Sequence, residues 1–320
     1  MLASIKKREK NILLLFFLLM IVGGILRIFS SSSIDISPVE TKEKKEISAD
    51  FDNEKINQAW IEEQSKIHYR NQEEITEFLL ELKQRFPLEK DRLWVISFLR
   101  LGTPYKLGCL GEESGIDLDP IFRLDFTDCT AFVLTNTALL CSQSAEEASA
   151  KMAQINYRSD DISFYNRLHF TTDRNKVSLF FKDVTEQLID PELIEEAEII
   201  LNKKGNEGKR IVDIDWEKQG LLKYIPIEYC QRSNFLETLP FALGVAFVRE
   251  ATIEQGLDVV HEGFLFEGEK FIHASSLKGE VIQVSFQDYL IQQGSKHFDG
   301  VIFFEVFCPS EDLRKLSGRR

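Results

Sequence analysis

The amino-acid sequence predicts an α+β protein, with helices in the first half and an antiparallel sheet in the last third. Ile75, Phe78, Leu79 and Leu82 recur at the spacing of one helix face. From residue 241 onward, short runs rich in branched and aromatic residues are separated by turn residues, which is typical of strands. Helices followed by strands, without alternation, indicate the α+β class.

The helical segments follow from apolar spacing and stop signals. We expect helices over residues 54–86, ended by Pro87, and over 90–101, ended by Gly102. Two more are expected over 129–140 and 145–155, with an irregular stretch over 156–180. The segment 181–240 is mixed, with a helix over 191–201 and a weak strand over 211–214.

The expected strands cover 241–248, 257–266, 270–275, 280–285 and 300–307, with a short helix over 286–293.

The N-terminal residues are expected to lie outside this fold. Four basic residues precede an apolar run over 12–26, which favours an uncleaved membrane anchor over residues 1–29. A cleaved signal segment is the next interpretation, and a buried core helix is a third. Residues 30–53 read as a flexible linker, and 54–320 as one catalytic domain with a helical extension over 54–89. We therefore expect an exported protein.

Charge and cysteine content exclude some functions. The net charge of −13 leaves no basic stripe for nucleic acid. The five cysteines contain no CxxC pair, so we expect no metal site and no cofactor. Their scattered spacing favours buried single cysteines over a disulfide framework, and the odd number leaves at least one thiol free.

Cys129 and two distant histidines form the strongest candidate site. Cys129 begins an apolar, helix-patterned run directly after Asp128, and a helix N-terminus favours a thiolate. A nucleophilic thiol needs a base, and the base needs an orienting partner. His261 and His273 lie on one predicted hairpin and are candidates for these two roles.

The register of that hairpin decides how the two histidines meet. If the turn centres on Glu267, His261 and His273 are direct cross-strand neighbours, with Cβ atoms about 5 Å apart. If the centre lies half a residue later, Ala274 is opposite His261 and the histidines are diagonal. Both registers permit an imidazole pair.

Four short motifs follow one another along the chain: Gly-Thr-Pro-Tyr at 102–105, Asp-Cys at 128–129, His-x-Gly at 261–263 and Ile-His-Ala at 272–274. Together they resemble the NlpC/P60 superfamily of papain-like cell-wall cysteine peptidases. Residues 125–133, 166–170 and 271–276 resemble its DUF1460 branch of N-acetylmuramoyl-L-alanine amidase-like proteins. The resemblance covers about residues 90–307 and implies a catalytic helix packed on an antiparallel sheet, with an inserted segment.

The resemblance implies roles for individual residues. Cys129 would be the nucleophile, His261 the base and His273 the orienting residue. Tyr105 would lie near the thiol. The resemblance also implies that four residues bind the substrate or support the oxyanion: Tyr105, Asp128, Arg167 and His169.

The chain departs from the family pattern at Leu134, Glu262 and Lys106. By strand alternation, Glu262 should point away from His261, so we expect activity to survive.

The resemblance implies cleavage of the amide between N-acetylmuramic acid and L-alanine in peptidoglycan fragments. Two alternatives stay open: a stem-peptide endopeptidase acting after D-glutamate, and an inactive cell-wall-binding module. The expected location is the bacterial cell envelope, either anchored in the inner membrane or periplasmic. The oligomeric state is not predicted.

Overall fold

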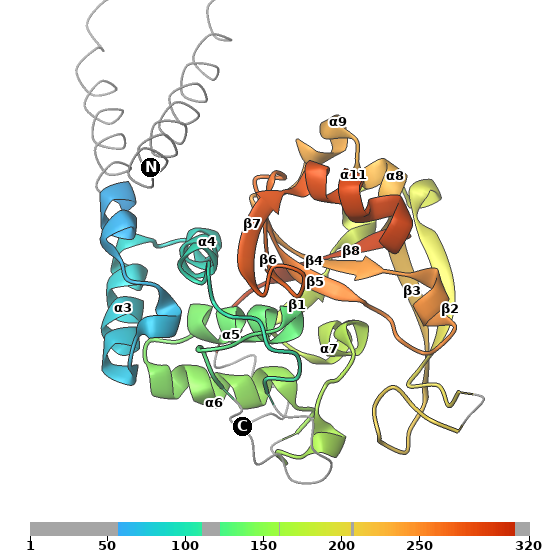
Figure 1. Cartoon of the computed structure of the whole chain (residues 1–320), viewed down its shortest axis with the longest axis horizontal. Helices are drawn as coiled ribbons and strands as arrows, with labels where there is room; N and C mark the ends of the chain where they lie inside the picture. Colours follow the sequence, from blue (N-terminus) through green and yellow to red (C-terminus); the bar gives the residue numbers. More distant parts are fainter. Residues whose placement is uncertain (1–56, 111–121, 160, 206–207, 311–320) are drawn as a thin grey trace, which may run out of the picture. The chain divides into compact units, whose positions relative to one another are not determined.

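The computed structural model describes residues 57–110, 122–159, 161–205 and 208–310 (Figure 1). Within them, helices and a single antiparallel sheet confirm the predicted α+β class. The predicted anchor over 1–29 and linker over 30–53 lie outside the described residues. Among the described helices, none has the length and apolar character needed to cross a bilayer.

Two helices, α3 and α4, precede the site. The Asn71 side chain accepts the Glu74 backbone N–H, and the Glu74 carboxylate accepts the Asn71 N–H, which caps the start of α3. The predicted stripe, from Ile75 to Leu82, is buried. Helix α3 spans Gln72–Arg85 and α4 spans Glu89–Leu99. The bounds of α4 are close to the predicted 90–101, but the single helix predicted over 54–86 was wrong. A helix over 57–63 is followed by the 3-10 turn Ile67–Tyr69, and the Asn71 cap then begins α3.

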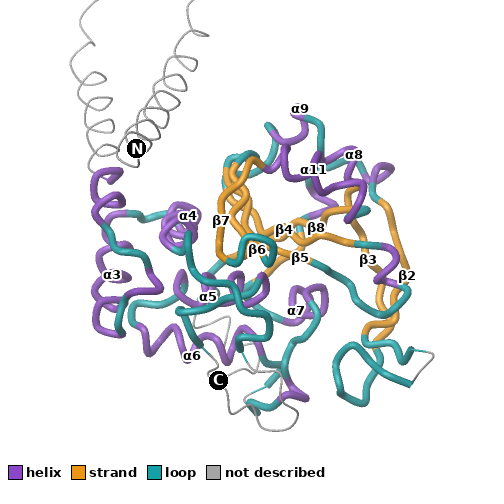
Figure 2. Tube along the Cα trace, in the orientation of Figure 1, coloured by secondary structure: helices purple, strands orange, loops and turns teal. Residues whose placement is uncertain are grey.

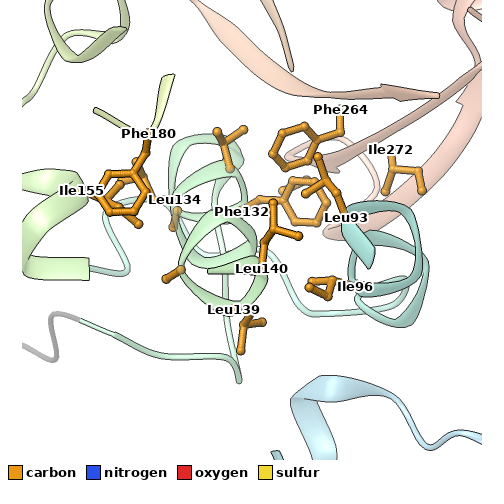
Figure 3. Close-up of a cluster of buried hydrophobic side chains, with 14 of the residues drawn as sticks. Leu93, Ile96, Phe132, Leu134, Leu139, Leu140, Ile155, Phe180, Phe264 and Ile272 are labelled. Atoms are coloured by element: carbon orange, nitrogen blue, oxygen red, sulfur yellow. The ribbon is translucent and has the colours of Figure 1, made fainter. Parts of the chain in front are cut away.

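Helix α5, Cys129–Leu140, is the central helix of the fold. Every residue from Ala131 to Leu140 is buried, and the three polar ones, Thr135, Asn136 and Thr137, each donate a hydrogen bond. Figure 3 shows Phe132 of α5 beside Phe264 of the sheet, with ring centroids 5.9 Å apart. Helix α6, Ala145–Asn156, packs on α5.

The sheet of the described residues is antiparallel throughout, in the order β2-β3-β8-β4-β5-β6-β7, with β1 paired to β8. Its strands are β1 Phe181–Asp183, β2 Glu195–Leu201, β3 Lys218–Pro226, β4 Ala242–Val248, β5 His261–Phe266, β6 Lys270–Ser275, β7 Glu280–Ser285 and β8 Gly300–Val306.

Helices cover both faces of this sheet (Figures 1 and 2). Helices α5 and α6 lie on one side, where Ala246, Phe264 and Ile272 join the larger apolar core. On the other side, Phe247 and Phe271 pack under three other helices. These are α8 Ile227–Cys230, α9 Ser233–Leu236 and α11 Phe286–His297.

Two predictions for residues 181–240 were wrong. Residues 191–201 form a 3-10 turn, Pro191–Leu193, and then strand β2, in which buried Ile199 and Leu201 alternate with a less buried residue. The predicted strand at 211–214 is a series of bends, and the strand that pairs with β2 is β3. A run of three apolar residues at 199–201 fits a helix or a strand equally well, so only the pairing partner decides.

The stretch 156–180, predicted to be irregular, contains helix α7, Thr171–Val177. Its residues 171–175 are polar yet buried, because ion pairs and hydrogen bonds replace apolar packing there. An apolar period could not reveal such a helix. The other short elements are α10, Glu250–Ile253, and the 3-10 turns Ile67–Tyr69, Phe164–Asn166 and Thr185–Gln187.

The expectation of single cysteines was wrong for one pair. Cys141, at the C-terminal cap of α5, forms a disulfide with Cys308, which follows β8. Cys109, Cys129 and Cys230 are free. The bond ties the end of the central helix to the chain beyond the last strand of the sheet.

Candidate active site

Cys129 is the first residue of α5, and Asp128 sets that start. Asp128 has extended backbone angles, and its Oδ1 atom accepts the Ala131 backbone N–H at 2.7 Å. This is an N-terminal cap, which begins the helix at the next residue. Asp128 therefore fixes where the Cys129 thiol leaves the backbone.

A loop beside the helix start holds Tyr105 near the thiol. The Lys106 N–H donates to the Thr127 carbonyl at 2.9 Å, and Gly108 N–H donates to Asp128 Oδ2 at 3.0 Å. Burial, and then the proximity of Cys129, raise the pKa of Tyr105 to about 12. The Tyr105 phenol is thus neutral and stays a hydrogen-bond donor.

The histidines lie on the predicted hairpin, but both predicted registers were wrong. Phe264 pairs with Ile272 and Phe266 with Lys270, so Gly263 is opposite His273. Glu267 and Gly268 form the turn with positive φ angles of 57° and 66°, and Glu269 adds one more residue to the loop. The turn is therefore centred on Gly268, which lies beyond both expected centres. His261 and His273 share a face as diagonal neighbours.

The two imidazoles are hydrogen-bonded to each other. His261 Nε2 lies 2.7 Å from His273 Nδ1, with the rings nearly perpendicular. Gly263 makes this approach possible, because a Cβ atom there would lie 2.8 Å from the His273 Cβ. The bond occupies one nitrogen of His261 and leaves Nδ1 as its second ring nitrogen.

Aromatic rings surround the histidine pair. Phe271 stacks on His273 at 4.6 Å, and Phe247 stacks on His261 at 6.0 Å. Burial lowers the pKa of His261 to about 4. Burial, followed by the neighbouring His261, lowers the pKa of His273 to about 3. Both rings are therefore neutral near pH 7, and one proton is shared between them.

The sulfur of Cys129 lies against strand β5 at the residue after His261. It accepts a hydrogen bond from the Glu262 backbone N–H. Burial, and then the carboxylates of Asp128 and Glu262, raise the pKa of the Cys129 thiol to about 12. Burial and the two carboxylates therefore oppose the thiolate that the helix N-terminus favours.

A neutral thiol and a neutral imidazole can still act as a nucleophile and base. Neither the thiolate nor the imidazolium is favoured at this site, so proton transfer from Cys129 to His261 would accompany attack on a bound carbonyl. The second histidine can hold the tautomer of the first, as an orienting residue does.

Arg167 and His169 lie together around Phe164. Arg167 Nη2 donates to the Leu110 carbonyl at 2.7 Å, and His169 Nε2 lies 2.7 Å from the Phe164 carbonyl oxygen. Leu110 follows the loop that carries Tyr105. These contacts connect Arg167 to that loop.

Sequence reasoning missed Tyr289 of α11. Its ring centroid is 5.1 Å from that of His273 and 6.3 Å from that of His261. Burial, and then the nearby Cys129, raise the pKa of the Tyr289 hydroxyl. The helical pattern of residues 286–293 predicted the helix but contained no signal that it covers the histidines.

Comparisons with known proteins place the fold. A family model described as N-acetylmuramoyl-L-alanine amidase-like matches residues 95–296. A DUF1460 protein from Legionella pneumophila is 24% identical, with a TM-score of 0.60, over 73% of this chain and 95% of that one. An N-acetylmuramoyl-L-alanine amidase from Bacteroides uniformis is 18% identical, with a TM-score of 0.55, over 68% of this chain and 99% of that one. No curated protein sequence matches the chain.

Proposed function

The chain belongs to the N-acetylmuramoyl-L-alanine amidase-like family, and from this premise we propose that it is a cysteine hydrolase of peptidoglycan fragments. The proposed bond is the amide between the lactyl group of N-acetylmuramic acid and L-alanine. The observation that carries the proposal is the arrangement of three residues: the Cys129 sulfur lies against Glu262 of β5, the residue after His261, and His261 is bonded to His273 at 2.7 Å.

In the proposed reaction, the Cys129 sulfur attacks the amide carbonyl and its proton passes to His261. His261 then delivers that proton to the leaving amine as the C–N bond breaks. Water hydrolyses the resulting thioester, which releases the acid and restores the thiol. His273 keeps the tautomer and orientation of His261.

We propose two hydrogen-bond donors that stabilise the oxyanion. The Cys129 backbone N–H lies at the first position of α5, where helix N–H groups lack partners within the helix. The neutral Tyr105 hydroxyl is a second donor near the sulfur. Asp128 contributes by capping the helix, and Arg167 and His169 are proposed for the substrate groove, where a guanidinium would suit an acidic stem peptide.

The motif order and the packing of α5 on β5 and β6 support a papain-like NlpC/P60 core. We also propose that the chain acts in the cell envelope, exported and anchored or periplasmic. The Cys141–Cys308 disulfide supports export, because such bonds persist in oxidising compartments.

Product analysis tests the proposed bond. The full chain is incubated with purified muramyl peptides, and the products are identified by mass spectrometry. An amidase releases a peptide that begins with L-alanine, whereas an endopeptidase leaves muramyl dipeptide intact. Cys129→Ala should abolish product formation, while Cys230→Ala, a change at a buried free cysteine on α8, should keep it. Binding of muramyl peptides without any turnover would instead indicate a wall-binding module.

A further inference from the structure

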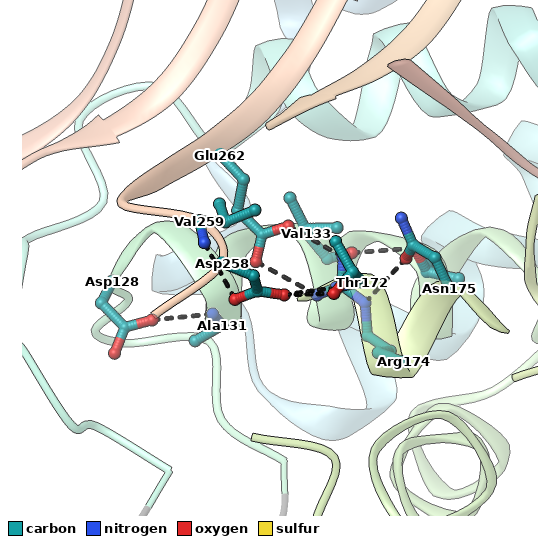
Figure 4. A network of polar contacts seen from close by, with 10 residues as sticks. Asp128, Ala131, Val133, Thr172, Arg174, Asn175, Asp258, Val259 and Glu262 are labelled. Atoms are coloured by element: carbon teal, nitrogen blue, oxygen red, sulfur yellow. Dashed lines mark hydrogen bonds and ion pairs between the residues drawn. The ribbon is translucent and has the colours of Figure 1, made fainter. Parts of the chain in front are cut away.

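A buried ion pair lies directly behind the candidate nucleophile. Arg174 of α7 binds Glu262 of β5 through two hydrogen bonds, Nη1 to Oε1 at 3.1 Å and Nη2 to Oε2 at 2.8 Å (Figure 4). Both side chains are only 1% exposed. A two-pronged bond between planar groups fixes orientation as well as distance. The backbone of Glu262 is therefore fixed relative to α7.

The Arg174 side chain is itself tightly held. Its guanidinium lies over the Phe181 ring at 4.5 Å and near the Phe304 ring at 5.6 Å. Its Nε atom donates to Asn175 Oδ1 at 3.3 Å. An arginine stacked on aromatic faces loses little freedom when it binds a carboxylate. Arg174 is thus a rigid anchor for β5.

A second buried carboxylate ties the same stretch of chain to α7. Asp258 Oδ2 accepts the Thr172 backbone N–H at 2.7 Å and the Thr172 hydroxyl at 2.6 Å. Figure 4 shows both carboxylates directed at α7. His261 lies between these two attachment points in the chain. The segment that presents the candidate base is therefore clamped to α7 on both sides.

Glu262 of this ion pair also acts on the Cys129 thiol, by a backbone hydrogen bond and by the charge of its carboxylate. The Glu262 N–H donates to the Cys129 sulfur, and the Glu262 carboxylate raises the pKa of the thiol. Other titratable groups facing the sulfur are Asp128, which caps α5, and the Tyr105 and Tyr289 hydroxyls. Arg174 is the cation that offsets the Glu262 charge.

We propose that Arg174 and Glu262 are positioning residues for the hydrolysis proposed above: their ion pair holds the Glu262 N–H against the Cys129 sulfur and sets the charge balance at that sulfur. The inference rests on the proposed function for its catalytic meaning. It also explains how the chain accommodates an acid where the family pattern has an apolar residue: the Glu262 carboxylate is directed at α7 and leaves His261 unobstructed.

Alkylation of Cys129 tests the pair without any substrate. The full-length protein is treated with iodoacetamide from about pH 6 to about pH 9, where the rate follows the thiolate fraction. Modification of Cys129 is counted separately from Cys109 and Cys230 by peptide mass spectrometry. Glu262→Gln removes the charge but keeps the size, and should speed Cys129 alkylation about three- to tenfold at each pH.

Asp173→Asn is the matched control. Asp173 is also a buried carboxylate of α7, but it binds Lys218 and Arg158 rather than a group beside the thiol. It should leave the Cys129 alkylation rate unchanged. A general loosening of α7 would change the rate in both variants, and that result would overturn the proposal.

The double variant Glu262→Leu with Arg174→Met separates positioning from folding. Replacing a buried ion pair by apolar residues of similar size often preserves the fold. We expect a folded protein with kcat reduced about tenfold or more and KM little changed. Folded variants with wild-type alkylation and kcat would overturn the proposal, as would failure of both Glu262 variants to fold. If muramyl peptides are not hydrolysed at all, the alkylation result still stands by itself.

Discussion

His261 Nε2 and His273 Nδ1 lie 2.7 Å apart, in a pocket of aromatic rings that keeps both imidazoles neutral. A bond this short between two neutral rings requires one to donate and the other to accept. If His261 transfers a proton through its remaining nitrogen, the tautomer of His273 determines whether that nitrogen is free to accept.

The two histidines should therefore differ in what they tolerate. His261→Ala should reduce kcat about 100- to 10,000-fold, since it removes the proposed base. His273→Gln should keep measurable activity, because an amide can still hold His261, whereas His273→Ala should lose more. Steady-state kinetics on muramyl peptides measure this, with circular dichroism as the folding control. Equal losses in His273→Gln and His261→Ala would contradict an orienting role.

The dependence of activity on pH should have an unusually low acid limb. The base must be neutral, so kcat/KM falls only as pH drops through the pKa of His261, about 4. An ordinary histidine would give a limb near pH 6.5. Initial rates of the folded protein between about pH 3.5 and about pH 8 decide between them. A limb near 6.5 would show that the base is not buried as described.

Tyr289 should support the histidines mainly through its ring. Tyr289→Ala removes a half-buried ring from their surface and should cost about 2 kcal/mol of unfolding free energy, with kcat down about tenfold. Tyr289→Phe keeps the ring and should unfold within about 0.5 kcal/mol of the parent protein. Urea titrations and kinetics of both variants are the measurement. Wild-type kcat in Tyr289→Ala would refute the support role.

The disulfide should stabilise the fold without taking part in the site. Cys141 and Cys308 are separated by 167 residues in sequence. Replacing both by Ala should lower the free energy of unfolding by about 2–5 kcal/mol. Activity at room temperature should persist, because Cys129 lies at the opposite end of α5. A reductant should destabilise the parent protein by a similar amount and leave the double variant unchanged; loss of activity in the folded double variant would contradict this separation.

Local pattern was sufficient for the helices that are apolar on at least one face. Ile75, Phe78 and Leu82 predicted α3, and the run after Cys129 predicted α5 nearly to its last residue. Pattern failed at α7, because its buried residues are polar. Arg174 belongs inside only because Glu262, 88 residues later, is there to bind it.

The candidate site also has a part that the sequence predicts and a part that only the packing reveals. Cys129 at a helix start, with His261 and His273 on one hairpin, follows from residue type and from the two-residue repeat of strands. The register, the mutual bond of the histidines and the Tyr289 ring above them depend on where the turn is centred and on the packing of α11.

The sequence by itself therefore determined the fold class, the order of its main elements and the three residues of the candidate site. Only the tertiary structure brought together the groups that influence the protonation of that site. The helix start favours a thiolate, but burial of Cys129 near Asp128 and Glu262 favours the neutral thiol. The reason is physical: a pKa depends on all the charges and solvent within a few ångströms, and these come from residues far apart in the chain.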